Sequence, residues 1–313
     1  MEKKKNYIIN IKKLWNFEPY IKKYKKSKYT NKNSEAVHII NRMKTVSLIL
    51  NKNLKKNDSI LELGFGAGQS STNFLKNGYY YTGVDISRSL VNFAKYSNKK
   101  FIKKNRASFH VGSMEDKLNF KNQVFDAVVI IGALQYVMNI KRCFKEIKRV
   151  MKPSGIFILA QTNSFAIMDI ISPRNFIKFL ARVIFKENFM HSYSNTFKSI
   201  LLETTNLRKI LNIKGNEKWL ENKFLNTGQF IPWNFKAKRR ILSYDRICKI
   251  VKENNFRIRQ YVYGEVFFYR KKDKVSNFIF TILNFILNFL YKIKIFNFLL
   301  KRISSSNIFV LEK

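Results

Sequence analysis

The sequence predicts an α/β protein whose core is a mostly parallel β-sheet with helices on both faces. Between residues 57 and 163, short apolar runs alternate with segments of helical periodicity, the order expected when strands and helices follow one another in a parallel sheet. Eight of the eleven glycines also lie in this interval, so tight turns are concentrated there. We therefore expect the core of the protein at 57–163.

The first strand of this core is expected at Ile60–Leu63, and a glycine-rich turn follows it. Gly64, Gly66 and Gly68 lead into a helical segment at Gln69–Leu75. Glycine suits such a turn because it accepts positive φ and has no Cβ to keep a ligand away from the backbone. A strand, a glycine turn and a helix N-terminus together form a cradle of the size of a nucleotide.

Two common nucleotide motifs are absent from this turn. A dinucleotide fingerprint requires glycine where Gln69 stands, and a phosphate-binding loop would end in Gly-Lys-Ser/Thr. Glu62, at the end of the first strand, would repel a pyrophosphate and favour a ligand that carries positive charge.

The second strand is expected at Tyr79–Asp85 and ends in an acid. Asp85 follows Gly64 by 21 residues, the spacing at which a carboxylate at the tip of the second strand holds the two ribose hydroxyls of a nucleotide. Ser87 is expected to cap a helix at Ser89–Tyr96.

The remaining core elements follow from apolar runs and helical stripes. A third strand is expected at Ala107–Val111, and a fourth follows Asp126. A helical stripe runs from Ile140 to Met151, with Cys143 in its apolar face, and Lys152–Gly155 predicts a turn before a strand at Gly155–Ala160.

The C-terminal part is expected to add a helix at Tyr244–Lys252, a long strand at Phe256–Tyr269 and a last strand at Asn307–Leu311. Val275–Arg302 is the most apolar segment, and a polar stripe along it favours a buried or interfacial helix over a membrane span. Core packing, a dimer contact and an anionic membrane all remain open for this segment.

These motifs together resemble class I S-adenosylmethionine (SAM)-dependent methyltransferases. The resemblance rests on Glu62-x-Gly64-x-Gly66-x-Gly68, on the acid Asp85, on the strand led by Asp126, and on the helix–Lys-Pro-x-Gly–strand order near residue 152. It implies a Rossmann-like, seven-stranded sheet whose last strand is antiparallel and lies between the fifth and sixth. It also implies SAM as the cofactor.

The resemblance implies roles for individual residues. The three glycines admit the cofactor, Glu62 favours its cationic methionine part through water, and Asp85 holds the ribose. The other expected cofactor residues are Ile86 against the adenine, Met114 and Glu115 around the base, and Ile131 and Gly132 near the methyl group. Relatives often have Asp where Ser113 stands.

A strong base is missing where relatives often place one, because Gln135 and Tyr136 occupy those positions. Tyr136 and His191 are the candidate catalytic residues, His191 as the only histidine of the region that the family uses as a substrate lid. Other aromatic residues expected to line the lid are Tyr193, Trp219, Phe230 and Trp233.

Four divisions of the chain are expected: a basic helical cap at 1–56, the SAM-binding core at 57–163, a helical lid at 164–240, and a C-terminal completion of the core at 241–313. Two cysteines without CxxC spacing indicate a reducing compartment, so we expect a cytoplasmic protein. Three histidines far apart in sequence give no metal-ligand pattern, and no metal is expected.

The net charge of +40 has two explanations. It indicates either a polyanionic partner, such as RNA or an anionic membrane surface, or a lysine-rich composition spread over the whole surface. The favoured function is methyl transfer to a small-molecule acceptor, hydrophobic or lipid-linked. An RNA methyltransferase and a SAM-binding scaffold without catalysis remain alternatives, and the sequence leaves the oligomeric state open.

Overall fold

A computed structural model describes residue 16, residues 34–163 and 242–264, and part of the C-terminal region: 281–283, 285–286, 289–290, 298, 300–302 and 304–313. The expected lid, with His191 and its aromatic residues, lies outside the described residues, as does most of the expected N-terminal cap.

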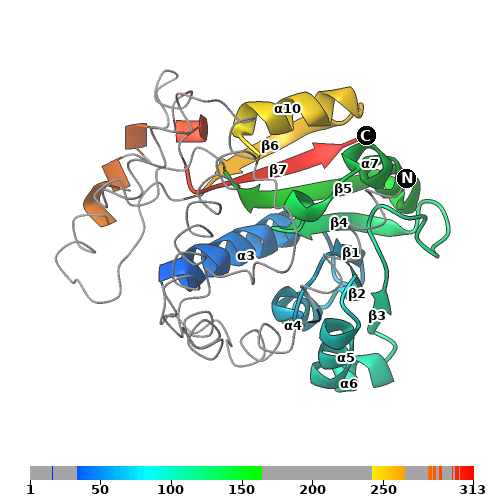
Figure 1. Cartoon of the computed structure of the whole chain (residues 1–313). Helices are drawn as coiled ribbons and strands as arrows, with labels where there is room; N and C mark the ends of the chain where they lie inside the picture. The colour runs from blue at the N-terminus through cyan, green and yellow to red at the C-terminus, as the bar shows by residue number, and fades with distance from the viewer. Residues whose placement is uncertain are drawn as a thin grey trace, which may run out of the picture.

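Seven strands form one sheet in the order β3-β2-β1-β4-β5-β7-β6 (Figure 1). Strands β1 to β5 pair in parallel, and β7 runs antiparallel between β5 and β6. The predicted fold and the place of its last strand are therefore confirmed. The strands are β1 Ser59–Leu63, β2 Tyr80–Asp85, β3 Ala107–Val111, β4 Phe125–Ile131, β5 Met151–Thr162, β6 Arg257–Tyr263 and β7 Ser306–Glu312.

Helices cover both faces of the sheet (Figure 1). On one face, α7 and α10 pack over the alternate side chains of β1, β4, β5 and β7. On the other, α3, α4 and α5 pack over the intervening side chains. The central strands are thus buried on both faces, which explains their continuous apolar runs. The helices are α3 Ser34–Asn53, α4 Gln69–Lys76, α5 Arg88–Ser97, α6 Lys99–Lys103, the 3-10 turn η1 Leu134–Tyr136, α7 Ile140–Val150 and α10 Tyr244–Glu253.

One local prediction was wrong, and a second was confirmed only in part. Lys152–Gly155 is not a separate turn, because β5 already begins at Met151 and pairs there with Phe125. The register then shifts, so that Ala127 pairs with Ile156, and the intervening residues form a bulge. The sixth strand ends at Tyr263, and residues 265–269 of the long strand predicted there lie outside the described residues.

Two other local predictions, at Ser87 and Cys143, were confirmed. The Ser87 hydroxyl accepts a hydrogen bond from the backbone N–H of Leu90 and caps α5. Cys143, on the buried face of α7, is fully buried in the apolar core. Within the described part of the chain, none of the helices combines the length and the apolar character that a membrane crossing requires.

Candidate cofactor site

The predicted cofactor residues all lie near or beyond the carboxyl ends of parallel strands. The glycine turn follows β1, Asp85 ends β2, Met114 lies beyond β3, and Gly132 follows β4. In a parallel sheet these ends meet at one edge, which is where open α/β sheets bind ligands. Backbone bonds link the segments: Gly64 N–H donates to the carbonyl of Val84, and Gly112 N–H to that of Asp85.

The glycine turn needs its glycines. Gly64, Gly66 and Gly68 have φ values of 74°, 61° and 74°, a region that other residues rarely adopt. A Cβ added at Gly64 would lie 2.4 Å from the Cβ of Ala133 and 3.0 Å from Cε of Met114. The segments after β1, β3 and β4 therefore meet at Gly64, as the cofactor prediction requires.

Asp85 joins the glycine turn to the start of α5. Its Oδ2 accepts the backbone N–H of Gly66 at 2.8 Å, and its Oδ1 accepts that of Ser87 at 2.9 Å. Burial raises the pKa of Asp85 from 3.8 to about 6, against the opposing effect of these backbone hydrogen bonds. The backbone N–H of Ile86 is a third hydrogen-bond donor to this carboxylate, which leaves about one of its four lone-pair sites for a ribose hydroxyl.

Asn16 reaches the same strand tip. The side-chain oxygen of Asn16 accepts hydrogen bonds from the hydroxyl of Ser87 at 3.1 Å and from the backbone N–H of Ser89 at 3.2 Å. Ile86, the expected adenine contact, lies between these groups and Asp85 and is half-buried. Asn16 is thus a neighbour of the site that the sequence pattern did not single out.

Glu62 lies beneath the glycine turn and is almost fully buried. Its carboxylate accepts hydrogen bonds from the hydroxyls of Ser70, at 2.6 and 2.8 Å, and of Tyr81, at 2.8 Å. Burial raises the pKa of Glu62 from 4.5 to about 7, although both hydroxyls oppose the shift. Its contacts tie β1 to α4 and β2, and its expected effect on the methionine part of SAM stays a prediction.

Met114 and Glu115 point to different places. Met114 approaches Gly64, as described above, whereas Glu115 turns toward the start of α7. The two oxygens of Glu115 accept the backbone N–H groups of Met138 and Asn139 at 2.8 and 3.0 Å. The structure thus brings Met114 to the glycine turn. The Glu115 carboxylate instead holds the segment after β4, so the contact of Glu115 with adenine stays a prediction.

The segment after β4 carries no strong base among its described residues. Gly132 has a φ of 71° and donates its N–H to the carbonyl of Ala160, while the Gln135 amide donates to the carbonyl of Gly132 at 2.7 Å. Tyr136 and Ile131 are half-buried at this edge. These contacts fix the backbone that is predicted to lie near the methyl group.

Arg42 on α3 is a candidate that the sequence analysis missed. It is 5% exposed, and its Nη2 donates to the hydroxyl of Thr162 at 3.0 Å. Its Nη1 lies 3.4 Å from the position that a Cβ of Gly132 would take. A buried cation therefore stands beside the segment after β4. A single arginine within a helix belongs to no motif, so only the tertiary structure reveals it.

These residues fit the charged and polar groups of SAM. The ribose would meet Asp85, the backbone can approach at the glycines, and Arg42 offers a cation for the methionine carboxylate. Gln69, at the start of α4, has a buried amide nitrogen without a hydrogen-bond partner in the described part of the chain, and so offers a further donor.

Comparison with known proteins agrees with this geometry. The family described as "Methyltransferase domain" matches residues 61–159. A demethylmenaquinone methyltransferase of Leptospira interrogans is 32% identical over 145 residues, which cover 46% of this chain and 57% of the relative. A sterol 4-C-methyltransferase of Caenorhabditis elegans is 32% identical over 118 residues, 36% of this chain and 34% of the relative.

Among solved structures, the PH0226 protein of Pyrococcus horikoshii OT3 is 32% identical and aligns over 43% of this chain and 62% of its own, with a TM-score of 0.37. The chain spans about half the length or less of the two curated relatives described above. The matched region contains the glycine turn, Asp85 and the β4 segment that meet at one edge of the sheet. Residues 61–159 therefore match a methyltransferase domain, and the residues at this edge of the sheet fit SAM as its cofactor.

Proposed function

We propose that this protein transfers the methyl group of SAM to a small, hydrophobic acceptor. The observation that carries the proposal is the meeting of the β1, β3 and β4 segments at Gly64, next to the Asp85 carboxylate that ends β2. The matched family and the relatives named above support it.

Each residue of the edge would have a distinct task. Bound SAM would supply an electrophilic methyl group, and the protein would orient it and exclude water. Asp85 would bind a ribose hydroxyl, and the glycine turn would let backbone N–H groups approach. Gly132 would bring the β4 backbone close to the reacting atoms.

Arg42 would bind the carboxylate of the methionine part. The substitution Arg42→Met is therefore expected to weaken SAM binding about tenfold, the effect of losing roughly 1.4 kcal/mol. Methylthioadenosine lacks that carboxylate, so its affinity should change little. Equal losses for both ligands, measured by calorimetry, would show that Arg42 acts only on the fold.

The acceptor would be one that needs little help from a protein base. Gln135 and Tyr136 lie in the turn η1 after β4, where no described residue is a strong base. His191 stays a candidate base in the expected lid. An acidic hydroxyl or a carbon nucleophile fits such a site. The names of the two curated relatives refer to a quinone and a sterol, and this supports a hydrophobic acceptor.

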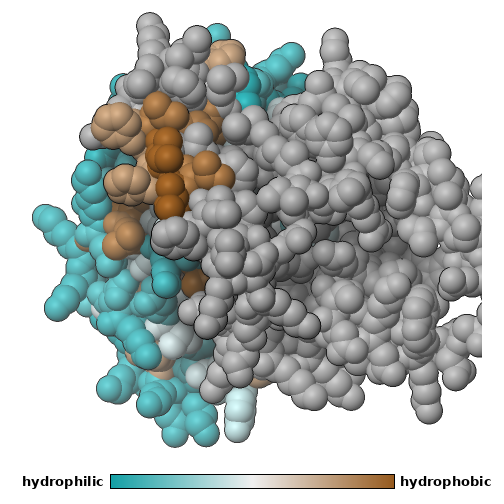
Figure 2. All heavy atoms as spheres, turned by 90° about the vertical axis from the view of Figure 1, so that its left-hand side faces the viewer, coloured by the Kyte–Doolittle hydropathy of each residue, from teal (hydrophilic) through white to brown (hydrophobic). Residues whose placement is uncertain are grey.

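An exposed apolar surface favours an acceptor drawn from a membrane. Ile282, Phe285, Ile286 and Phe289 are helical, have the spacing of one helix face, and are 43–74% exposed. Figure 2 shows apolar side chains gathered into a patch on this side of the molecule. The net charge of +40 would attract an anionic lipid surface, so we include peripheral membrane contact in the proposal.

Transfer of a labelled methyl group tests the function. Purified protein with methyl-labelled SAM is incubated with the lipid, small-molecule and RNA fractions of a cell extract. Label in a hydrophobic small molecule is the expected result, and label in RNA would favour the nucleic-acid alternative. SAM binding without label in any fraction would instead support a non-catalytic scaffold.

A further inference from the structure

Strand β5 changes character at its carboxyl end. Ile156–Ala160 is apolar and buried, but Gln161 and Asn163, which follow, are polar and equally buried, at 3% and 1% exposure. On the neighbouring strand, Asn307 is fully buried and is the register partner of Gln161. Two amide side chains therefore stand side by side within the protein, at the edge of the sheet that carries the cofactor site.

These two amides have unused hydrogen-bonding groups. Within the described residues, neither the oxygen nor the nitrogen of the Gln161 amide has a partner. The Asn307 oxygen accepts the hydroxyl of Tyr261 at 2.6 Å, but its amide nitrogen has no partner there. A buried, unpaired polar group lowers the stability of the folded state, so such a group calls for an explanation through a ligand or an ordered water.

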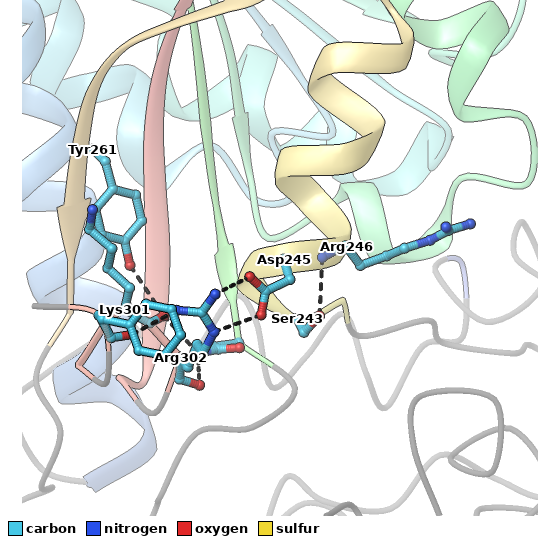
Figure 3. A network of polar contacts seen from close by, with 8 residues as sticks. Ser243, Asp245, Arg246, Tyr261, Lys301 and Arg302 are labelled. Atoms are coloured by element: carbon cyan, nitrogen blue, oxygen red, sulfur yellow. Dashed lines mark hydrogen bonds and ion pairs between the residues drawn. The ribbon is translucent and has the colours of Figure 1, made fainter. Parts of the chain in front are cut away.

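The surrounding polar groups are paired, so the unpaired atoms are not a general feature of this region. The Asn163 amide donates to the carbonyl of Arg302 at 2.8 Å. Arg302 in turn binds the Asp245 carboxylate through two nitrogens, at 2.5 and 2.8 Å, as Figure 3 shows beside Tyr261. This network holds Asn163 and Arg302 against the start of α10, and the Tyr261 hydroxyl holds Asn307.

The amide pair lies next to the segment after β4. Gly132 N–H donates to the carbonyl of Ala160, the residue before Gln161. Side chains alternate along a strand, so Gln161 projects to the face of Leu159, the face on which Leu134 of η1 also packs. The pair is therefore placed beside the backbone that is predicted to approach the methyl group.

We propose that Gln161 and Asn307 bind an uncharged hydroxyl of the methyl acceptor, an inference that rests on the proposed function. The hydroxyl would accept a hydrogen bond from the Asn307 amide and donate one to the Gln161 oxygen. An amide pair without net charge favours a neutral oxygen group over a carboxylate or phosphate. The acceptor class is then a hydrophobic compound that carries a hydroxyl group.

The substitution Gln161→Met tests this role, because it keeps the volume and removes the polar atoms. A naphthoquinol, which carries ring hydroxyls, is the probe, and naphthalene, which carries none, is the reference ligand. We expect the naphthoquinol to bind the wild-type protein with SAM analogue present, and to bind Gln161→Met about tenfold more weakly. Naphthalene should bind both proteins equally.

Stability and cofactor affinity complete the test. Removing an unpaired buried amide should leave the melting temperature of the free protein unchanged or raise it, and SAM affinity should stay the same. Gln260→Met, at an exposed position of β6, is the matched control and should change nothing. A lower melting temperature for Gln161→Met, or undiminished naphthoquinol binding, would overturn the inference, as would a naphthoquinol that does not bind the wild type. Failure of SAM to bind the wild type would instead refute the proposed function.

Discussion

Glu62 and Asp85 are two buried carboxylates with different surroundings. Asp85 is held by backbone N–H groups at the tip of β2, where a ribose could share its oxygens. Glu62 is enclosed by Ser70 and Tyr81 beneath the glycine turn. The same functional group therefore supports the glycine turn at Glu62, whereas at Asp85 it is proposed to bind the ribose.

Glu62 should make the stability of the protein depend on pH. Its folded pKa of about 7 lies above the ordinary value of 4.5, so the folded state binds the proton more tightly than the unfolded state. The stability that protonated Glu62 provides is complete below pH 4.5 and is lost as the pH rises toward 7, a change of roughly 3 kcal/mol.

The variant Glu62→Gln should remove this dependence, because a glutamine cannot ionise. Urea unfolding at several pH values measures it: wild type should lose stability relative to Glu62→Gln between pH 4.5 and 7. A constant difference between the two proteins across that range would contradict the assigned burial of Glu62.

At the scale of elements, the glycine turn can be tested by a pair of substitutions. Gly64→Ala places a Cβ 2.4 Å from that of Ala133 at a φ of 74°, so it should both destabilise the protein and weaken SAM binding at least tenfold. Gly78→Ala is the matched control, with a φ of 92° but only the flexible side chain of Lys56 near its Cβ. It should cost about 1–2 kcal/mol of stability and leave SAM affinity unchanged. Equal affinity losses in the two variants would contradict the assigned role of the turn.

Elements that depend on local pattern could be predicted from the sequence. β1, β4 and β7 are apolar runs buried on both faces, and Ser87 is a cap that acts within one helical turn. The bulge in β5 could not be predicted, because it depends on which residue of β4 each residue of β5 pairs with.

Dependence on tertiary contacts also explains which site residues the sequence analysis missed. The glycines and Asp85 belong to a spaced motif, whereas Arg42, Gln161 and Asn307 are joined to the site only by tertiary contacts. A lone polar residue in an apolar segment shows that something must pair with it, but the sequence does not show what.

At the scale of the whole molecule, the exposed apolar patch and the positive charge predict binding to anionic membranes. Phe285→Glu should reduce flotation with phosphatidylglycerol vesicles about tenfold, since burying a phenylalanine is worth roughly 1.5–3 kcal/mol. Tyr96→Glu is the matched control, because Tyr96 on α5 is 73% exposed and Phe285 is 74% exposed. Similar losses of flotation in both variants would show that charge alone drives membrane binding. Undiminished flotation of Phe285→Glu would show that the apolar patch does not bind the membrane.

The central claim is that the carboxyl edge of the sheet binds SAM through Asp85. Calorimetric titration of SAM into the wild type, Asp85→Ala and Asp126→Ala tests it most directly. Asp126 lies at the opposite end of the strands, where it binds Ser59 and Lys152, so its loss should lower stability without changing SAM affinity. We predict saturable binding to the wild type and to Asp126→Ala, and a loss of at least tenfold in Asp85→Ala. Undiminished binding to Asp85→Ala, or no binding to the wild type, would contradict the account.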